Sequence, residues 1–416
     1  MRPLDVGVIG CGTAGSAAAV FLARAGHDVT LYERVPEPGP VGAGITIQPT
    51  GLHVLTKLGL YAYTVSRGSR IDCLLCETPE KRAIVDLVYE TVGEGLFGLG
   101  LHRGVLFEGL YSLVRRERIR VRTGVEIVDL ARETSKRTWL VDVHRRRHGP
   151  HELVVVADGA RSQLRDDTST SKRVERYPWG ALWFVGKDTR AADDARTRRL
   201  HQICDGNRRF LGILPTGVGP LAGPGDPLVS LFWSIHGDRV ADWKKRGLAA
   251  WKDEVRELED EDTAPILEQI HDVDQVLFAA YHDVVMHRWS TRNVVYLGDA
   301  AHATSPQLGQ GCNLALWDAM TLAESLEEEE RDLAYALDRY SRRRQDHLDF
   351  YQFATRWLTP FFQGDHAWLG SLRDVAMPLM CRVGVFKRVM TLSMLGVMEG
   401  FWGDTLTLRL PKETPD

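Results

Sequence analysis

Cysteine is scarce in this sequence, and the few cysteines form no framework. Six are scattered over 416 residues, unlike the dense pattern of small secreted proteins that depend on disulfides. Cys73 and Cys76 have the spacing of a redox or zinc motif, but no second pair accompanies them. In the strand expected there, residues three apart point to opposite faces. We therefore predict structural cysteines, no metal site and a reducing, cytoplasmic environment.

An excess of positive charge and a long apolar run are also missing. The formal net charge is −4, whereas a nucleic-acid-binding chain needs a strongly basic face. The most apolar late segment, 375–398, is interrupted by Pro378, Gly384, Gly396 and several basic residues, unlike a membrane span. We expect neither a nucleic-acid partner nor stable membrane insertion. The length suits two or three domains.

A glycine-rich turn near the start predicts a dinucleotide site. Residues 5–10 have the pattern of a buried strand, 10–25 that of a small-residue helix and 28–32 that of a second strand. In this context the glycines allow a tight turn and close approach of a pyrophosphate, which the helix N-terminus attracts. A carboxylate at position 33 can accept hydrogen bonds from an adenosine ribose. The expected cofactor contacts are Gly10, Gly12, Thr13, Ala14, Gly15, Glu33 and Arg34.

Two later segments follow buried strands and carry more polar groups than a turn needs. Asp158 follows the apolar strand 153–157, and Asp299 follows the strand 293–297. Ligands of such sheets bind at the carboxyl ends of the strands. Gly309 and Gly311 leave room for a flat ring, and the helix that follows directs its positive end at that ring. The candidate contacts in this segment are Asp299, Pro306, Gly309, Gly311, Cys312 and Asn313.

Together these segments resemble the signatures of the single-component (class A) flavin monooxygenases, the family of para-hydroxybenzoate and salicylate hydroxylases. The resemblance spans roughly residues 5–345. The matching segments are Gly10–Gly15 with Glu33, Gly42–Ile45 with Pro49, His102–Arg103, Asp158–Gly159 and Gly298–Asp299.

The resemblance implies FAD as the cofactor and gives roles to particular residues. Gly44 and Ile45 would lie near FAD, and Arg103 would contact the flavin's phosphate and ribityl region. Asp299 would bind the ribityl chain, and Asp158 would serve both FAD placement and the nicotinamide reaction. Two positions depart from the family pattern: Thr50, where Asn is frequent, and Cys312, which is small enough to fit.

The resemblance also implies a reaction. NAD(P)H, a transient co-substrate, reduces the flavin, oxygen adds to it, and the flavin C4a-hydroperoxide hydroxylates an aromatic or polycyclic small molecule. The cofactor carries this chemistry, and the sequence identifies no catalytic side chain. His302 belongs to the signature and is interpreted as structural.

The segment order predicts an α/β protein with two domains. A Rossmann-type FAD-binding domain comprises residues 1–172 and 286–345, a largely antiparallel substrate-binding sheet is inserted at 173–285, and a helical C-terminal segment covers 346–416. The substrate pocket would lie between the inserted sheet and the loop at 306–311. The pocket candidates are Trp183, Phe210, Leu214, Trp233 and Pro306.

Several alternatives stay open. The same fold could serve a flavin-dependent dehydrogenase or a halogenase, although the sequence contains no Trp-x-Trp-x-Ile-Pro segment. A flavoprotein with non-redox FAD that binds or cyclises a ligand would use the same cofactor residues. The chain could be a monomer or a homodimer, and its C-terminal segment could close the pocket or pack on the flavin domain.

Overall fold

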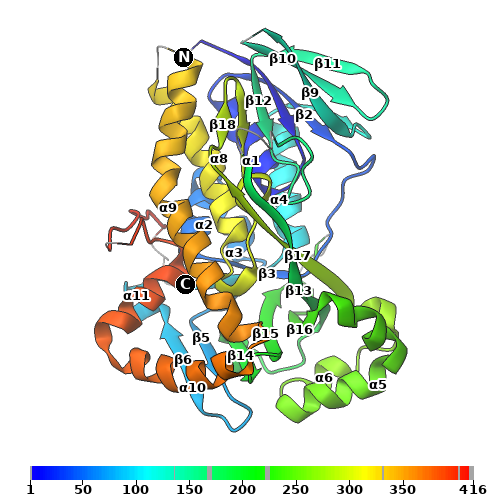
Figure 1. Ribbon diagram of the computed structural model, residues 1–416, viewed down its shortest axis with the longest axis vertical. Helices are drawn as coiled ribbons and strands as arrows, with labels where there is room; N and C mark the ends of the chain where they lie inside the picture. Colours follow the sequence, from blue (N-terminus) through cyan, green and yellow to red (C-terminus); the bar gives the residue numbers. More distant parts are fainter. Residues whose placement is uncertain are drawn as a thin grey trace.

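Two sheets in two halves of the molecule organise the fold (Figure 1). The computed structural model describes residues 2–134, 136–165, 171–220, 225–329, 332–401 and 403–411. Strands β13 (Ser171–Lys187) and β17 (Leu277–Met286) run from one half to the other, and the long helix α9 (Leu333–Phe362) extends along one side (Figure 1).

The first sheet has six strands in the order β18-β19-β12-β1-β2-β8. Its strands run parallel, except that the short β18 pairs antiparallel with β19 at the edge. Every residue of β12 is buried, as expected for a parallel strand covered on both faces. The bounds are β1 Asp5–Ile9, β2 Asp28–Glu33, β8 Arg120–Thr123, β12 Leu153–Val156, β18 Ser290–Thr291 and β19 Val294–Tyr296.

Helices rich in small and apolar residues cover this sheet. The alanines at 17–19 in α1 are fully buried, which lets α1 pack closely on α8. The helix bounds are α1 Thr13–Arg24, α2 Pro49–Leu58, α3 Tyr61–Val65, α4 Arg103–Arg116, α7 Asp299–His302 and α8 Gly311–Glu328. Two three-stranded sheets complete this half, formed by β3 Gly44–Ile47, β7 Gly98–His102 and β4 Ser69–Ile71, and by β11 Arg147–His151, β10 Arg137–Asp142 and β9 Ile127–Thr134.

The second sheet has seven strands in the order β17-β13-β16-β15-β14-β5-β6. Its neighbours are antiparallel except for β14 and β5, which are parallel. The predicted insertion at 173–285 does not contain the whole sheet, because β5 and β6 come from the first part of the chain and pair beside β14. The remaining bounds are β5 Cys73–Glu77, β6 Ala83–Val88, β14 Arg199–Asp205, β15 Arg209–Gly217 and β16 Leu228–His236.

Different helices cover the two faces of the second sheet. Trp243 and Trp251 of α5 are buried in one apolar cluster with the sheet residues Leu211, Leu231 and Trp233. The opposite face packs against the C-terminal helices through a second cluster. The bounds are α5 Val240–Leu258, α6 Ala264–Leu267, α10 Ala367–Arg382 and α11 Gly384–Leu395. The short 3-10 turns are η1 Tyr89–Thr91, η2 Ala195–Arg198, η3 Gly237–Arg239, η4 Val273–Gln275 and η5 Pro306–Leu308.

Two general expectations can be compared with this fold. All six cysteines are free, including the buried Cys76 and Cys204, whose sulfur atoms lie 3.3 Å apart on neighbouring strands. Within the part of the chain that the structure describes, no helix combines the length and the apolar character needed to cross a membrane.

Candidate functional site

The first loop of the site joins β1 to α1. Gly10 has φ +100°, and a side chain there would collide with the carbonyl of Ala157, directly after β12, so the turn requires glycine. At Gly12, by contrast, an added Cβ would meet nothing within 4 Å. Gly12 therefore faces open space directly in front of the N-terminus of α1, as the dinucleotide interpretation requires.

Glu33 is fixed at the rim of this loop. One carboxylate oxygen accepts the amide of Cys11 at 2.8 Å and the other accepts the amide of Val35 at 2.9 Å. Each oxygen keeps a free lone pair, so the carboxylate can still accept hydrogen bonds from ribose hydroxyls. Arg34, the next residue, is exposed.

A single guanidinium joins the second and third loops. The Arg165 side chain is buried, and its Nε donates to the carbonyl of Ala300 at 2.7 Å. Its other nitrogens donate to the carbonyls of Ser162 at 2.8 Å and Ala160 at 3.0 Å. The loops at 158–162 and 298–300 thus share one charged donor, a link that sequence inspection missed, although Arg165 lies only a few residues after the Asp158–Gly159 segment.

Asp158 is a buried acid on the second of these loops. Burial raises the pKa of its carboxyl, although a hydrogen bond with Ser162 and the charge of Arg165 oppose the shift. Among the described residues its Oδ1 has no hydrogen-bond partner. A buried acceptor without a partner is costly, so this atom fits a site in which a bound group donates to it.

The third loop ends where α8 begins. Asp299 is exposed, and at Gly309, with φ +62°, an added Cβ would meet nothing within 4 Å. The side chain of Asn313 is occupied by the protein itself, because its oxygen accepts the amide of Gln48 at 2.9 Å and its nitrogen donates to the carbonyls of Thr46 and Gly309. Asn313 therefore positions the loop, because its side chain links Thr46 and Gln48 to Gly309.

The N-termini of α1, α4 and α8 converge around Cys312. Burial raises the pKa of the Cys312 thiol to about 12, while Arg103 and a hydrogen bond with Thr13 oppose the shift and Asp299 adds to it. These four side chains come from segments far apart in the sequence and lie close enough to interact. Three helix N-termini and the exposed Arg103 make the region electropositive, which suits a pyrophosphate.

A buried network of charged side chains, centred on Asp318 of α8, holds the third loop in place. The Asp318 carboxylate accepts the amide of Gly298 at 2.8 Å, contacts His302 Nε2 at 2.6 Å and accepts from Arg344 Nε at 2.7 Å. Burial alone would raise the pKa of Asp318, but His302 and Arg344 outweigh burial and lower it to about 2. His302 is thus a buried structural contact, as its place in the motif predicted.

The network continues into the C-terminal segment. Arg344 donates to Nδ1 of His347. Burial and the charge of Arg344 both lower the pKa of His347, so the ring is neutral. Its Nε2 donates to the carbonyl of Gly396 at 2.8 Å. Gln310, beside Gly309, donates to the carbonyl of Met394 at 2.7 Å, and Thr50 donates to that of Leu395 at 3.2 Å. The C-terminal segment therefore packs on the flavin-type domain.

The inner face of the second sheet carries an aromatic wall. Trp183 lies 5.1 Å from Phe232, and Phe210 lies 5.4 Å from Phe232 and 5.7 Å from Phe362 of α9. The indole N–H of Trp183 donates to the hydroxyl of Tyr281, and burial raises the pKa of this hydroxyl. Phe232 and Tyr281 were missed in the sequence, where only alternation within single strands was visible. Phe362 belongs to the C-terminal segment that could close the pocket.

The predicted pocket residues separate into two groups. Phe210 and Leu214 are buried in the cluster that contacts the C-terminal helices, and Trp183 is half-buried on the same wall as Phe232. Trp233 is a correction: it pairs with Leu182 and Leu211 and lies under α5, on the opposite face. Neighbouring strand residues point to opposite faces, and Phe232 takes the inward position. Pro306 is exposed at the third loop.

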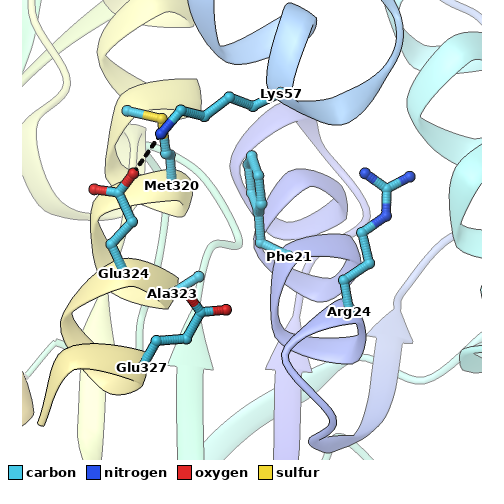
Figure 2. A pocket seen from close by; sticks show the side chains of 7 residues that line it. All are labelled: Phe21, Arg24, Lys57, Met320, Ala323, Glu324 and Glu327. Carbon is cyan, nitrogen blue, oxygen red and sulfur yellow. Dashed lines mark hydrogen bonds and ion pairs between the residues drawn. The ribbon is translucent and has the colours of Figure 1, made fainter.

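Two other features lie outside this site. Ligand atoms of Glu77, His201 and Glu259 lie within 4.8 Å of one another. Lys81 ion-pairs with both glutamates and His201 contacts Glu77 at 2.9 Å, so these ligand atoms already have partners within the protein. The groove in Figure 2, of about 340 Å³, lies at the far ends of α1 and α8 and contains the Lys57–Glu324 ion pair.

Comparisons with known proteins agree on one family. A model described as FAD binding domain matches residues 3–350. A probable 2-heptyl-3-hydroxy-4(1H)-quinolone synthase of Rhodococcus erythropolis is 28% identical over 340 residues, covering 80% of this chain and 82% of the relative. The 3-amino-4-hydroxybenzoate 2-monooxygenase of Streptomyces cremeus is 28% identical over 348 residues, covering 78% and 79%.

A solved structure shows the same fold. The crystal structure of a probable FAD-dependent monooxygenase from Pseudomonas aeruginosa matches with a TM-score of 0.74 at 21% identity, covering 89% of this chain and 99% of that one.

Removing Arg165 should loosen both loops. We expect Arg165→Ala to lower the free energy of unfolding by about 3 kcal/mol, because several buried carbonyls lose a charged donor. The variant should also release its cofactor more readily, measured as free flavin fluorescence after gel filtration. Arg161→Ala, which changes an exposed arginine of the same segment, is the matched control. Equal cofactor retention in both variants would contradict the role given to Arg165.

Neutralising Asp318 should destabilise the fold, because its buried partners lose the charge that pairs with them. Asp318→Asn leaves Arg344 and His302 buried beside an amide, and we expect a loss of about 3–5 kcal/mol in unfolding free energy. Because the folded-state pKa lies below the ordinary value of 3.8, the carboxylate stabilises the fold above about pH 4 and loses this effect as pH falls towards 2.

Urea unfolding at several pH values tests whether stability falls with pH in this direction. The wild type should lose stability between about pH 4 and pH 2 more steeply than Asp318→Asn. Asp338→Asn, at an exposed carboxylate paired with Arg342, should behave as the wild type. Parallel curves for wild type and Asp318→Asn would show that the carboxylate does not carry this pH dependence.

Proposed function

This chain belongs to the FAD binding domain family and is an FAD-dependent monooxygenase, and we propose that it uses NAD(P)H and oxygen to hydroxylate an aromatic or polycyclic small molecule. The observation that supports the proposal most strongly is the convergence of the first and third loops and three helix N-termini around Thr13, Arg103, Asp299 and Cys312. The loops lie at the carboxyl ends of β1, β12 and β19, where ligands of such sheets bind.

The residues present fit FAD. Gly12 and Gly309 leave open space, and Arg103 and Asp299 are exposed where the helices begin. Asp158 presents a buried acceptor that has no partner in the part of the chain that the structure describes. We propose that Glu33 binds the adenosine ribose, the N-terminus of α1 the pyrophosphate, and Asp299 the ribityl chain. Bound FAD would supply hydride acceptance and oxygen activation, which no side chain of the protein can provide.

The chain's own residues position the reactants and keep water away. The N-terminus of α8, with no Cβ at Gly309 and Gly311, offers a flat and electropositive surface for a ring that gains negative charge. The aromatic wall of Trp183, Phe210 and Phe232 suits a planar apolar substrate, because aromatic rings pack favourably edge-to-face or offset. A dry wall also limits unproductive loss of the activated oxygen.

The substrate class rests on both the wall and the relatives. Relatives are named for a quinolone and for an aminohydroxybenzoate, which are ring compounds. We propose an aromatic small molecule for this chain, together with oxygen and transiently bound NAD(P)H. We also propose that the protein acts in the cytoplasm as a monomer or homodimer.

Replacing Asp299 should weaken FAD binding. We expect Asp299→Ala to lose about 10- to 100-fold in affinity, because a charged hydrogen-bond acceptor for the ribityl chain is removed. Binding is measured by flavin fluorescence quenching on titration of the deflavinated protein. Asp193→Ala, at an exposed acid of the second half, should bind as the wild type. A fully yellow Asp299→Ala protein would refute this assignment.

The reaction itself is tested by NAD(P)H oxidation with the FAD-loaded protein and a panel of aromatic and polycyclic compounds. We expect one compound to accelerate oxidation, with less hydrogen peroxide released than NAD(P)H consumed and an oxygenated product in the mass spectrum. Product formation without NAD(P)H or oxygen consumption would instead support the non-redox flavoprotein. Desaturated or halogenated product would support the dehydrogenase or halogenase.

A further inference from the structure

Large apolar side chains are exposed along the two C-terminal helices α10 and α11. Trp368 is 63% exposed, Val375 61% and Val385 72%. We call the whole set the α10–α11 face; it consists of Trp368, Leu372, Val375, Leu379, Val383, Val385, Phe386 and Val389. Monomeric soluble proteins seldom expose contiguous apolar patches of this kind unless the patch contacts something.

The spacing of these residues makes one continuous stripe on α10. Positions 368, 372, 375, 379 and 383 follow each other at intervals of four and three, so they lie on the same side of the helix. The opposite side packs inward, where Gly370, Arg373 and Met377 are buried and Cys381 contacts the carbonyl of Ile84 on β6 at 3.9 Å. The helix is therefore amphipathic with its apolar stripe outward, the reverse of an ordinary surface helix.

Positive charges outnumber negative ones around the stripe. Arg382 and Arg388 are exposed and Lys387 is half-buried. Asp374 is the only carboxylate in the sequence from 367 to 395, and it pairs with Arg373 at 2.6 Å. Asp86 is a neighbouring acid, but it lies on β6, the strand on which the inward side of α10 packs. A local positive charge thus accompanies the stripe in a chain whose net charge is −4.

We propose that the α10–α11 face docks on an anionic phospholipid surface, with both helices lying in the interface. Outward apolar side chains enter the boundary between headgroups and acyl chains, and the flanking cations attract anionic headgroups. Figure 1 shows both helices at the outer edge of the molecule, away from the sheet that carries the cofactor loops, so a flat surface can reach them. This inference is independent of the substrate and of the reaction.

A second copy of the chain fits the face less well. A twofold contact would place the same patch on both subunits. It would therefore gather Arg382, Lys387 and Arg388 of both copies in one interface, while the only carboxylate of residues 367–395, Asp374, already pairs with Arg373. Like charges in a water-poor interface are unfavourable. Charge complementarity therefore favours anionic lipid as the occupant.

Vesicle co-sedimentation of the FAD-loaded full chain tests the proposal. The probes are phosphatidylcholine vesicles with and without phosphatidylglycerol. We expect binding to vesicles that contain phosphatidylglycerol, weakened by added salt, and little binding to phosphatidylcholine alone. Binding should raise and blue-shift tryptophan fluorescence, since Trp368 enters a less polar medium; a Trp368→Phe variant identifies the contribution of this indole.

Two double variants separate the apolar and charged contributions. Leu372→Gln with Leu379→Gln should weaken binding at least about tenfold, because two leucines no longer leave water. Arg382→Gln with Arg388→Gln should weaken it about fivefold per cation on anionic vesicles only. The matched controls are Val41→Gln with Tyr335→Gln, and Arg116→Gln with Arg342→Gln, all exposed positions elsewhere; both should bind as the wild type.

The outcomes decide whether anionic lipid or a second copy of the chain binds the α10–α11 face. Every altered side chain is exposed, so thermal unfolding and flavin content should remain as in the wild type, and this is checked for each variant. Equal loss of binding in controls and α10–α11 variants would overturn the proposal, as would no binding to either vesicle. If light scattering shows a dimer that only the Leu372→Gln, Leu379→Gln variant dissociates, while vesicle binding is absent, the face is a subunit interface.

Discussion

The fully buried carboxylate of Asp318 is the point on which the arrangement of this protein depends. A charge without water is tolerated only when other groups pair with it, and here the partners come from separate segments. Gly298 and His302 belong to the third cofactor loop, and Arg344 belongs to α9. Through His347 the same network reaches Gly396 in the C-terminal segment. Moving any of these segments would leave a buried charge or donor unpaired, so the loop, α8 and α9 are held as one unit.

Arg165 extends this principle to the cofactor loops. Its guanidinium binds carbonyls of the second and third loops together, and the first loop lies beside them because β1 is the parallel neighbour of β12. Charged groups thus fix the backbone of the loops on one side. The side proposed to face FAD has open space at Gly12 and Gly309 and an Asp158 oxygen with no partner among the described residues. The buried charges of the protein position the loops, and the oxygen chemistry is left to the flavin.

The two faces of the second sheet have different neighbours, and one of them carries the proposed substrate wall. One face is filled by Trp233 and the α5 tryptophans, and the other carries Phe210 and Phe232 towards α9. Because side chains alternate along a strand, the same strands serve both purposes. The C-terminal helices complete the inner face and turn an apolar stripe outward, so the segment that braces the cofactor loop also carries the proposed docking face.

The sequence alone determined the cofactor fingerprint, the Rossmann-type order of elements and most of the loop residues, because these features lie in short contiguous patterns whose spacing follows from helix and strand geometry. It did not reveal that β5 and β6 join the second sheet, that Arg165 links two loops, or that Arg344 pairs with Asp318 from 26 residues away. It also placed Trp233 in the pocket, whereas the register with Leu182 and Leu211 turns it under α5. These matters were decided only by tertiary structure, since pairing between distant segments and the choice of buried face depend on how whole elements pack, and no local pattern contains that information.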